Sequence, residues 1–138
     1  MKLLRYGISG KEKPGILDDT GVLRDLSGIV SDIAGETLLP ENIEHLRNST
    51  HLSLPEVKGT PRVGPCVSKV GKFICIGLNY SDHAEEAGMI VPPEPIIFAK
   101  ATSAICGPND DVIIPRNSVK TDWEVELGVV IGKPAKYV

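Results

Sequence analysis

The chain has 138 residues, of which 41% are hydrophobic and 24% charged, proportions that are typical of a globular protein. Its formal net charge of −3 comes from 15 basic and 18 acidic residues, and no basic run indicates a nucleic-acid partner. No apolar run reaches the roughly 18 residues that a membrane span requires, and a charged residue interrupts the apolar start, which argues against a secretory signal. We therefore expect a cytoplasmic protein that binds neither nucleic acid nor membranes.

The cysteines are Cys66, Cys75 and Cys106. Their number is odd and no two follow the C-x-x-C spacing, which argues against a disulfide framework or a zinc site. We expect reduced, buried thiols. Because Pro and Gly are plentiful, at 11 and 14 residues, turns and short strands are expected rather than a helical bundle.

The start of the chain predicts a small antiparallel sheet. Residues 1–8 alternate in polarity, and residues 16–23 place two short apolar runs on either side of an Asp-Asp-Thr-Gly turn. The apolar residues of 26–33 recur at helical spacing and predict a short helix. A second short helix is expected over 40–47, where Pro40 and the glutamate after it suit a first turn.

Residues 51–71 are rich in Pro and Gly and form the predicted connector between two domains. We therefore place a small N-terminal domain at 1–71 and a second domain at 72–138. His45 and His51 have no acidic or nucleophilic partner at a useful spacing, so we expect both to be surface histidines.

The second domain opens with an apolar run over 73–77 that predicts a buried strand. A short helix should follow, with Asn79 as its N-cap and Gly88 at its C-terminal end. His83 and Glu86 are three residues apart and would share one face of this helix. A carboxylate beside an imidazole suits general-base catalysis. An exposed helical ion pair has the same spacing, and the residues alone leave both interpretations open.

Segment 89–95 is apolar and rich in Pro, which suits either a lid over a site or a packed connector. Residues 96–100 predict a strand that ends in Lys100, whose ammonium group either binds a substrate carboxylate or is solvated. Two further strands are expected over 103–107 and 112–115, on either side of a turn.

Residues 122–131 alternate acidic and apolar side chains and then become apolar, a pattern that predicts a strand with two different faces. Asp122, Glu124 and Glu126 would project from one face, roughly 7 Å apart along the chain. Carboxylates placed side by side repel one another unless water screens them or a cation bridges them. The strand is therefore either half-exposed with a solvated acidic face, or a source of oxygen ligands for Mg²⁺ or Mn²⁺.

These segments resemble the fumarylacetoacetate hydrolase superfamily. The resemblance rests on motifs that occur in order: IGLNYSDHA at 76–84, PIIFAK at 95–100, GPND at 107–110, IP at 114–115 and DWEVELG at 122–128. It implies an α+β fold that is mostly β, with a small N-terminal domain followed by the first part of a mixed β-sandwich or roll. It also implies a homodimer that uses Mg²⁺ or Mn²⁺.

Carried over by motif position, the resemblance makes Glu124 and Glu126 metal ligands. His83 with Glu86 becomes the pair that activates water or transfers a proton. Tyr80 and Lys100 would lie near the substrate. A third metal carboxylate and a further lysine of the superfamily would come after the last motif in this sequence, so we expect the chain to be the N-terminal half of such an enzyme.

The resemblance further implies cleavage of a C–C or C–N bond in a small 2-oxo, β-diketo or ureido acid. The N-terminal start is similar to members named ureidoglycolate lyase and equally to hydrolases of 2,4-diketo-3-deoxy sugar acids, so the choice between hydrolase and lyase stays open. The alternative hypothesis is a truncated, catalytically inactive fragment of such an enzyme.

Overall fold

The structure is a computed structural model that describes residues 1–49 and 53–138. It confirms the predicted α+β class. The chain divides into two compact units, one made of Met1–Lys69 with Gly107–Val138 and the other of Val70–Cys106. The predicted division at residue 71 remains a prediction about domains.

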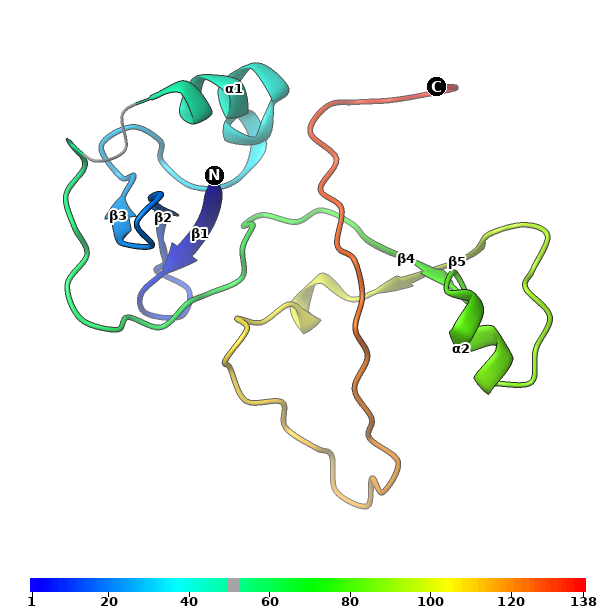
Figure 1. Cartoon of the computed structure of the whole chain (residues 1–138). Helices are drawn as coiled ribbons and strands as arrows, with labels where there is room; N and C mark the ends of the chain where they lie inside the picture. The colour runs from blue at the N-terminus through cyan, green and yellow to red at the C-terminus, as the bar shows by residue number, and fades with distance from the viewer. Residues whose placement is uncertain (50–52) are drawn as a thin grey trace. The chain divides into compact units, whose positions relative to one another are not determined.

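The first unit is built on an antiparallel sheet of strand order β1-β2-β3, as the sequence predicts (Figure 1). Its strands are β1 (Lys2–Tyr6), β2 (Lys13–Leu17) and β3 (Leu23–Asp25). The turn between β2 and β3 is held by the Asp18 carboxylate, which accepts hydrogen bonds from the Thr20 hydroxyl at 2.6 Å and the Val22 amide at 3.0 Å. An Asp side chain that bonds backbone amides ahead of it in this way favours a tight turn.

The predicted helix over 26–33 is wrong, although its apolar pattern identifies core residues. The Val30 amide donates to the Leu26 carbonyl at 3.0 Å, but the turn does not continue. Side-chain oxygens take over the amides instead, since Asp25 accepts from the Ser27 amide at 2.7 Å and Asp32 from the Ile33 amide at 2.8 Å. Such local bonds compete with a helix.

The hydrophobic core of the first unit joins its sheet to the helical segments. Its buried members are Ile16, Leu26, Ile33 and Leu46. Leu46 comes from α1 (Pro40–Asn48), the second predicted helix, which follows the 3₁₀ helix η1 (Gly35–Leu38). His45 is exposed on α1, as expected, whereas His51 lies outside the described residues.

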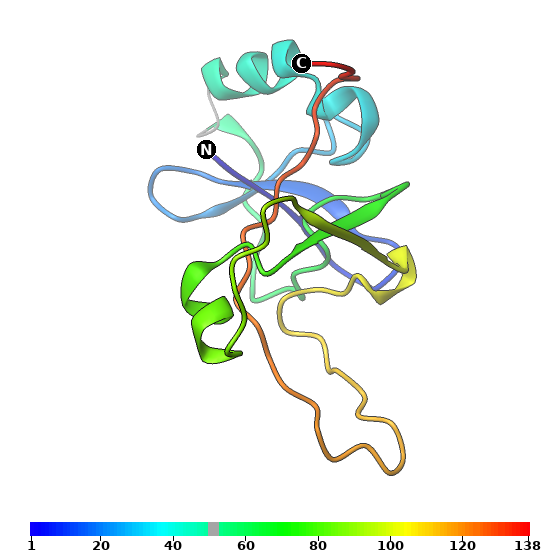
Figure 2. The same cartoon turned by 90° about the vertical axis from the view of Figure 1, so that its right-hand side faces the viewer.

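Residues 111–138, all of which the structure describes, form neither helix nor strand (Figures 1 and 2). The strands predicted over 112–115 and 122–131 are therefore wrong, and the strand predicted over 103–107 is wrong as well, because no residue in that range is in a strand. The 3₁₀ helix η3 (Thr102–Ala104) overlaps residues 103–107 instead. A strand requires backbone hydrogen bonds from a neighbouring strand. Neither sheet of the described residues includes residues 122–131, which we call the acidic segment.

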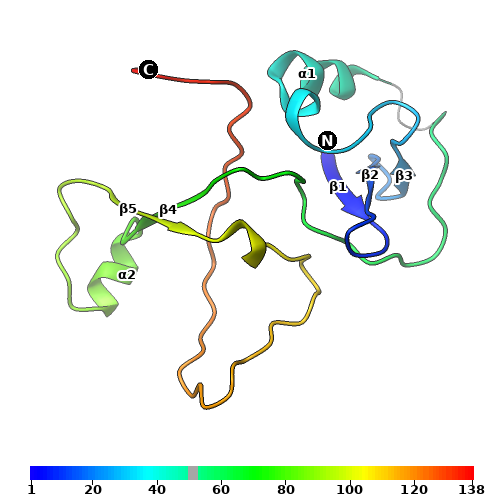
Figure 3. The same ribbon diagram turned by 180° about the vertical axis from the view of Figure 1, so that it is seen from behind.

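The second unit contains the predicted strands β4 (Phe73–Gly77) and β5 (Ile96–Lys100), which pair antiparallel, and helix α2 (Ser81–Glu86) between them (Figure 3). The prediction that β4 is buried is wrong, since Ile74 on β4 is 54% exposed and Ile97 on β5 is 68% exposed. A sheet of only two strands gives its faces little cover.

The thiols are free, as expected, but they are not all buried. Cys66 and Cys106 are exposed and Cys75 is half-buried. Cys75 lies on the thinly covered strand β4, which explains its partial exposure. None of the helices within the described ranges has the length and apolar character needed to cross a membrane.

Candidate functional site

Helix α2 carries the predicted His83–Glu86 pair. The chain turns from β4 into this helix through Leu78, whose φ of 49° lies in the left-handed region that non-glycine residues rarely adopt. The N-cap position is Tyr80 rather than the predicted Asn79, and no side chain caps it. Gly88 ends the helix with a φ of 64°, as predicted.

His83 and Glu86 both have exposed side chains. Their spacing places them on one face of α2. No hydrogen bond or ion pair joins them within the described part of the chain. The helix is anchored instead by Ala84, which is fully buried. The structure thus presents the two groups together to solvent, and their catalytic role remains a prediction.

The hairpin register separates Lys100 from the start of α2. Lys100 pairs with Phe73, whereas Gly77, which leads into α2, pairs with Ile96 at the opposite end of the hairpin. Five-residue strands put these ends roughly 13 Å apart. Tyr80, which is 38% exposed, therefore lies at the α2 end of the hairpin and Lys100 at the other.

Glu124 and Glu126 lie in the extended acidic segment of the first unit, and both are exposed. Among the described residues, neither glutamate forms an ion pair, and no group of three or more His, Cys, Asp or Glu side chains is arranged to hold a metal ion. The two carboxylates are the predicted ligand pair, and Mg²⁺ commonly uses one or two protein carboxylates with water in its remaining positions.

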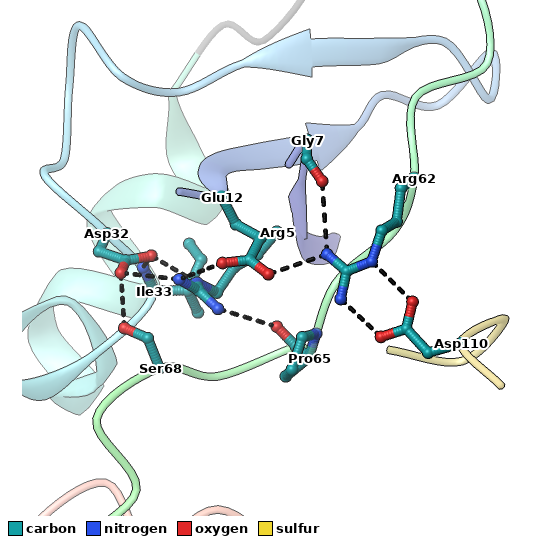
Figure 4. Close-up of polar contacts among 9 residues, drawn as sticks. All are labelled: Arg5, Gly7, Glu12, Asp32, Ile33, Arg62, Pro65, Ser68 and Asp110. Atoms are coloured by element: carbon teal, nitrogen blue, oxygen red, sulfur yellow. Dashed lines mark hydrogen bonds and ion pairs between the residues drawn. The ribbon is translucent and has the colours of Figure 1, made fainter. Parts of the chain in front are cut away.

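The structure also shows a polar cluster that the sequence analysis did not single out (Figure 4). We call it the ion network. Its members are Arg5, Glu12, Asp32, Arg62 and Asp110.

Arg5 on β1 forms the first half of the ion network. Its Nε donates to Asp32 Oδ1 at 2.7 Å and its Nη2 to Asp32 Oδ2 at 3.2 Å, a two-pronged arrangement. The same Nη2 lies 3.4 Å from Glu12 Oε2. The side chain of Arg5 is only 10% exposed, so these carboxylates replace the water that its guanidinium would otherwise bind.

Arg62 forms the second half of the ion network. Its Nε and Nη2 donate to the two carboxylate oxygens of Asp110 at 2.6 and 2.5 Å. Its Nη1 donates to Glu12 Oε1 at 2.8 Å and to the Gly7 carbonyl at 3.3 Å. A planar guanidinium that grips a carboxylate at two points fixes orientation as well as distance.

Hydrogen bonding outweighs burial in setting the ionisation of this half. Burial alone would raise the pKa of Glu12, but the hydrogen bond from Arg62, with backbone hydrogen bonds, holds that pKa below its usual value. The Arg62 hydrogen bonds and the Gly107 amide likewise lower the pKa of Asp110. Asp110 and Glu12 in turn raise the pKa of Arg62, so both carboxylates are ionised beside a fixed positive charge.

Asp32 behaves in the same way. Burial works to raise its pKa, but hydrogen bonds from Arg5, the Ser68 hydroxyl and the Ile33 amide lower it below the usual range. The Ser68 hydroxyl donates at 2.6 Å. The fully ionised carboxylate is therefore the form that the fold selects.

We expect the free energy of unfolding to be level above about pH 5 and to fall as the pH drops below about 4. The folded pKa values of Glu12, Asp32 and Asp110 are lowered, so the unfolded chain binds more protons, and their contribution is lost as the pH falls through the folded values. Urea unfolding between pH 7 and pH 3 measures this. Asp32→Asn should be less stable at pH 7 but show a shallower acid dependence. A wild-type free energy of unfolding that rises as the pH is lowered from 5 to 3 would contradict the expectation.

Residues 72–138 match the family model described as fumarylacetoacetate (FAA) hydrolase C-terminal. Proteins of Burkholderia multivorans and Burkholderia ambifaria, each provisionally named a hydrolase, are 63% identical to this chain over 138 residues. The match covers 100% of this chain and 49% of each relative, so the chain spans about half the length of the curated relatives it matches.

Proposed function

We propose that this protein is a metal-dependent hydrolase or lyase of the fumarylacetoacetate hydrolase family, whose family model matches residues 72–138. Its substrate would be a small 2-oxo, β-diketo or ureido acid, in which a C–C or C–N bond is cleaved. The observation that carries the proposal is that the matched segment contains every predicted site residue, from Tyr80 to Glu126. A homodimer in the cytoplasm is part of the same proposal.

Glu124 and Glu126 would hold the cation, Mg²⁺ or Mn²⁺. Their chemistry fits, because carboxylate oxygens are the ligands that hard cations prefer. Their exposure also fits, since within the described residues neither is tied up in an ion pair that a cation would have to displace. When bound, the cation would act as a Lewis acid toward the carboxylate and neighbouring oxygen of the substrate.

The other predicted residues would handle protons and substrate charge. Glu86 shares a helix face with His83, where a carboxylate can hold one imidazole tautomer. His83 would then take a proton from the attacking water or from the substrate. The Lys100 ammonium, exposed at the end of β5, would bind a substrate carboxylate, and the Tyr80 hydroxyl would orient the substrate.

Isothermal titration with Mn²⁺ tests the metal site. We expect binding by the wild-type chain and at least about a tenfold loss of affinity in Glu124→Gln and in Glu126→Gln, since loss of even an outer partner of a metal ligand costs 10- to 100-fold. Asp122→Asn is the matched control, because it removes one charge from the same acidic segment but no predicted ligand. Equal affinity in wild type and both glutamine variants would overturn the assignment.

Turnover extends the same experiment to the reaction class. A small β-diketo acid should lose its ultraviolet absorbance in the presence of the protein and Mn²⁺, and His83→Ala should lower kcat by about 10²- to 10⁴-fold while leaving Mn²⁺ affinity unchanged. Absence of both metal binding and turnover in the wild type would favour the alternative of an inactive fragment.

A further inference from the structure

The residues that flank segment 70–106 are bonded, on both sides, to other residues of the first unit. Before the segment, the Ser68 hydroxyl donates to Asp32 Oδ2 at 2.6 Å and the Ser68 amide donates to the Ile33 carbonyl at 3.0 Å. After the segment, Asp110 is gripped at two points by Arg62. All of these residues belong to the first unit. The two chain stretches that flank segment 70–106, which we call its base, are therefore held within one compact unit.

A close backbone approach reinforces the returning end. A Cβ on Gly107 would collide with the Val63 carbonyl oxygen and would lie 3.1 Å from the Gly64 Cα. The Gly64 amide donates to the Arg5 carbonyl at 2.8 Å, which adds this stretch to the edge of β1. Residue 107 therefore lies directly against a strand-like extension of the N-terminal sheet, at a distance that only glycine permits.

Glu12 makes the two ends parts of one structure. Its side chain is 5% exposed, and its two oxygens are divided between the two arginines, with Oε2 facing Arg5 and Oε1 facing Arg62 (Figure 4). The ion network therefore runs without a break from Asp32, beside the outgoing end, to Asp110 at the returning end. Loss of one charge removes a partner from each partly buried neighbour in the ion network, which couples the two ends energetically.

We propose that the ion network is a clamp that closes the base of segment 70–106, and that Arg62 is its positioning residue. The segment carries His83, Glu86 and Lys100, and the chain that follows Asp110 carries Glu124 and Glu126. Fixing both ends restricts the conformations of the segment and of the chain after it. The consequence for catalysis rests on the proposed function, whereas the clamp itself does not.

Hydrogen–deuterium exchange on the whole chain tests the clamp. Arg62→Ala should raise amide exchange over 107–110 by about tenfold or more, because local opening of these residues then no longer has to break the hydrogen bonds from Arg62. Asp110→Asn keeps an oxygen that can accept the hydrogen bond from the Gly107 amide. It should therefore give a smaller increase in exchange at the same amides. The milder variant keeps the test decisive if Arg62→Ala unfolds, which circular dichroism would reveal.

Arg24→Ala is the matched control. Arg24 also forms a partly buried ion pair, with its Nε 2.8 Å from Asp18 Oδ2, but it touches neither end of segment 70–106. It should leave exchange over 107–110 unchanged. Equal effects of Arg62→Ala and Arg24→Ala at these amides, or no effect of either Arg62→Ala or Asp110→Asn, would overturn the clamp.

Rescue distinguishes positioning from simple charge balance. Arg62→Lys restores the positive charge but not the two-point grip, so exchange over 107–110 should remain raised, and kcat for the β-diketo acid should fall more than KM rises. Full rescue by lysine in exchange and turnover would overturn the positioning role. If the wild type neither binds Mn²⁺ nor turns over substrate, the proposed function fails, and the exchange data still decide the clamp.

Discussion

Replacing Arg5 with alanine is expected to lower the free energy of unfolding by about 3–5 kcal/mol, the cost of removing one partner from a buried ion pair. Arg5 donates to Asp32 at 2.7 Å and faces Glu12 at 3.4 Å. The Glu12 side chain is 5% exposed and that of Asp32 is 22% exposed. Without Arg5, both carboxylates lose a positively charged partner. Water reaches these carboxylates too poorly to replace it.

Urea unfolding at pH 7, followed by circular dichroism, measures the effect of Arg5→Ala. The control is Arg47→Ala, because Arg47 pairs with Glu44 at 2.6 Å on the outside of α1, where the two side chains are 58% and 56% exposed. An exposed helical pair of this kind contributes about 0.5 kcal/mol or less. A loss below about 1 kcal/mol for Arg5→Ala would show that the ion network is screened like a surface pair.

Local patterns predicted the elements whose stability depends on near neighbours. Strands β1 to β3 follow from alternation around a tight turn, and α1 follows from a Pro-started helical pattern that buries Leu46. Helix α2 follows from its length and its glycine stop, although the N-cap falls at Tyr80 and not at Asn79. In each case the deciding interactions span only a few residues, or one hairpin.

The acidic segment shows why alternation is not sufficient. Residues 122–131 have the pattern of a strand, but their backbone would need a neighbouring strand to become one, and the described sheets do not include them. Trp123 is 79% exposed and Leu127 is 80% exposed, so the apolar face of this segment is as open as the acidic one. The pattern indicates which side chains share a face, whereas strand pairing depends on residues that are distant in the sequence.

In the candidate site and the ion network, too, local spacing predicts some features, whereas contacts between distant residues set the others. The shared helix face of His83 and Glu86 follows from a spacing of three residues. The position of Lys100 at the other end of the hairpin comes from strand register, which no local pattern sets. The members of the ion network are 27 residues apart for Arg5 and Asp32 and 48 for Arg62 and Asp110, so no motif or spacing links them in the sequence.

Replacing Leu26 with alanine is the second large effect that we expect, a loss of about 2–5 kcal/mol in the free energy of unfolding. Leu26 has no exposed surface and packs with Ile16, Ile33 and Leu46 in the core. The substitution removes buried methyl groups and leaves a cavity that the surrounding side chains fill only in part. Urea unfolding at pH 7 measures the loss.

This substitution also separates burial from helix propensity. Residues 26–33 have a helical spacing, and alanine is a better helix former than leucine, so Leu26→Ala would be neutral or stabilising if the segment contributed chiefly as a helix. The structure shows a single turn closed by Asp25 and Asp32, so burial should decide the outcome. Ile29→Ala is the matched control, since Ile29 lies in the same turn but is 44% exposed, and we expect a loss below about 1 kcal/mol. Equal losses at Leu26 and Ile29 would contradict the assignment of Leu26 to the core.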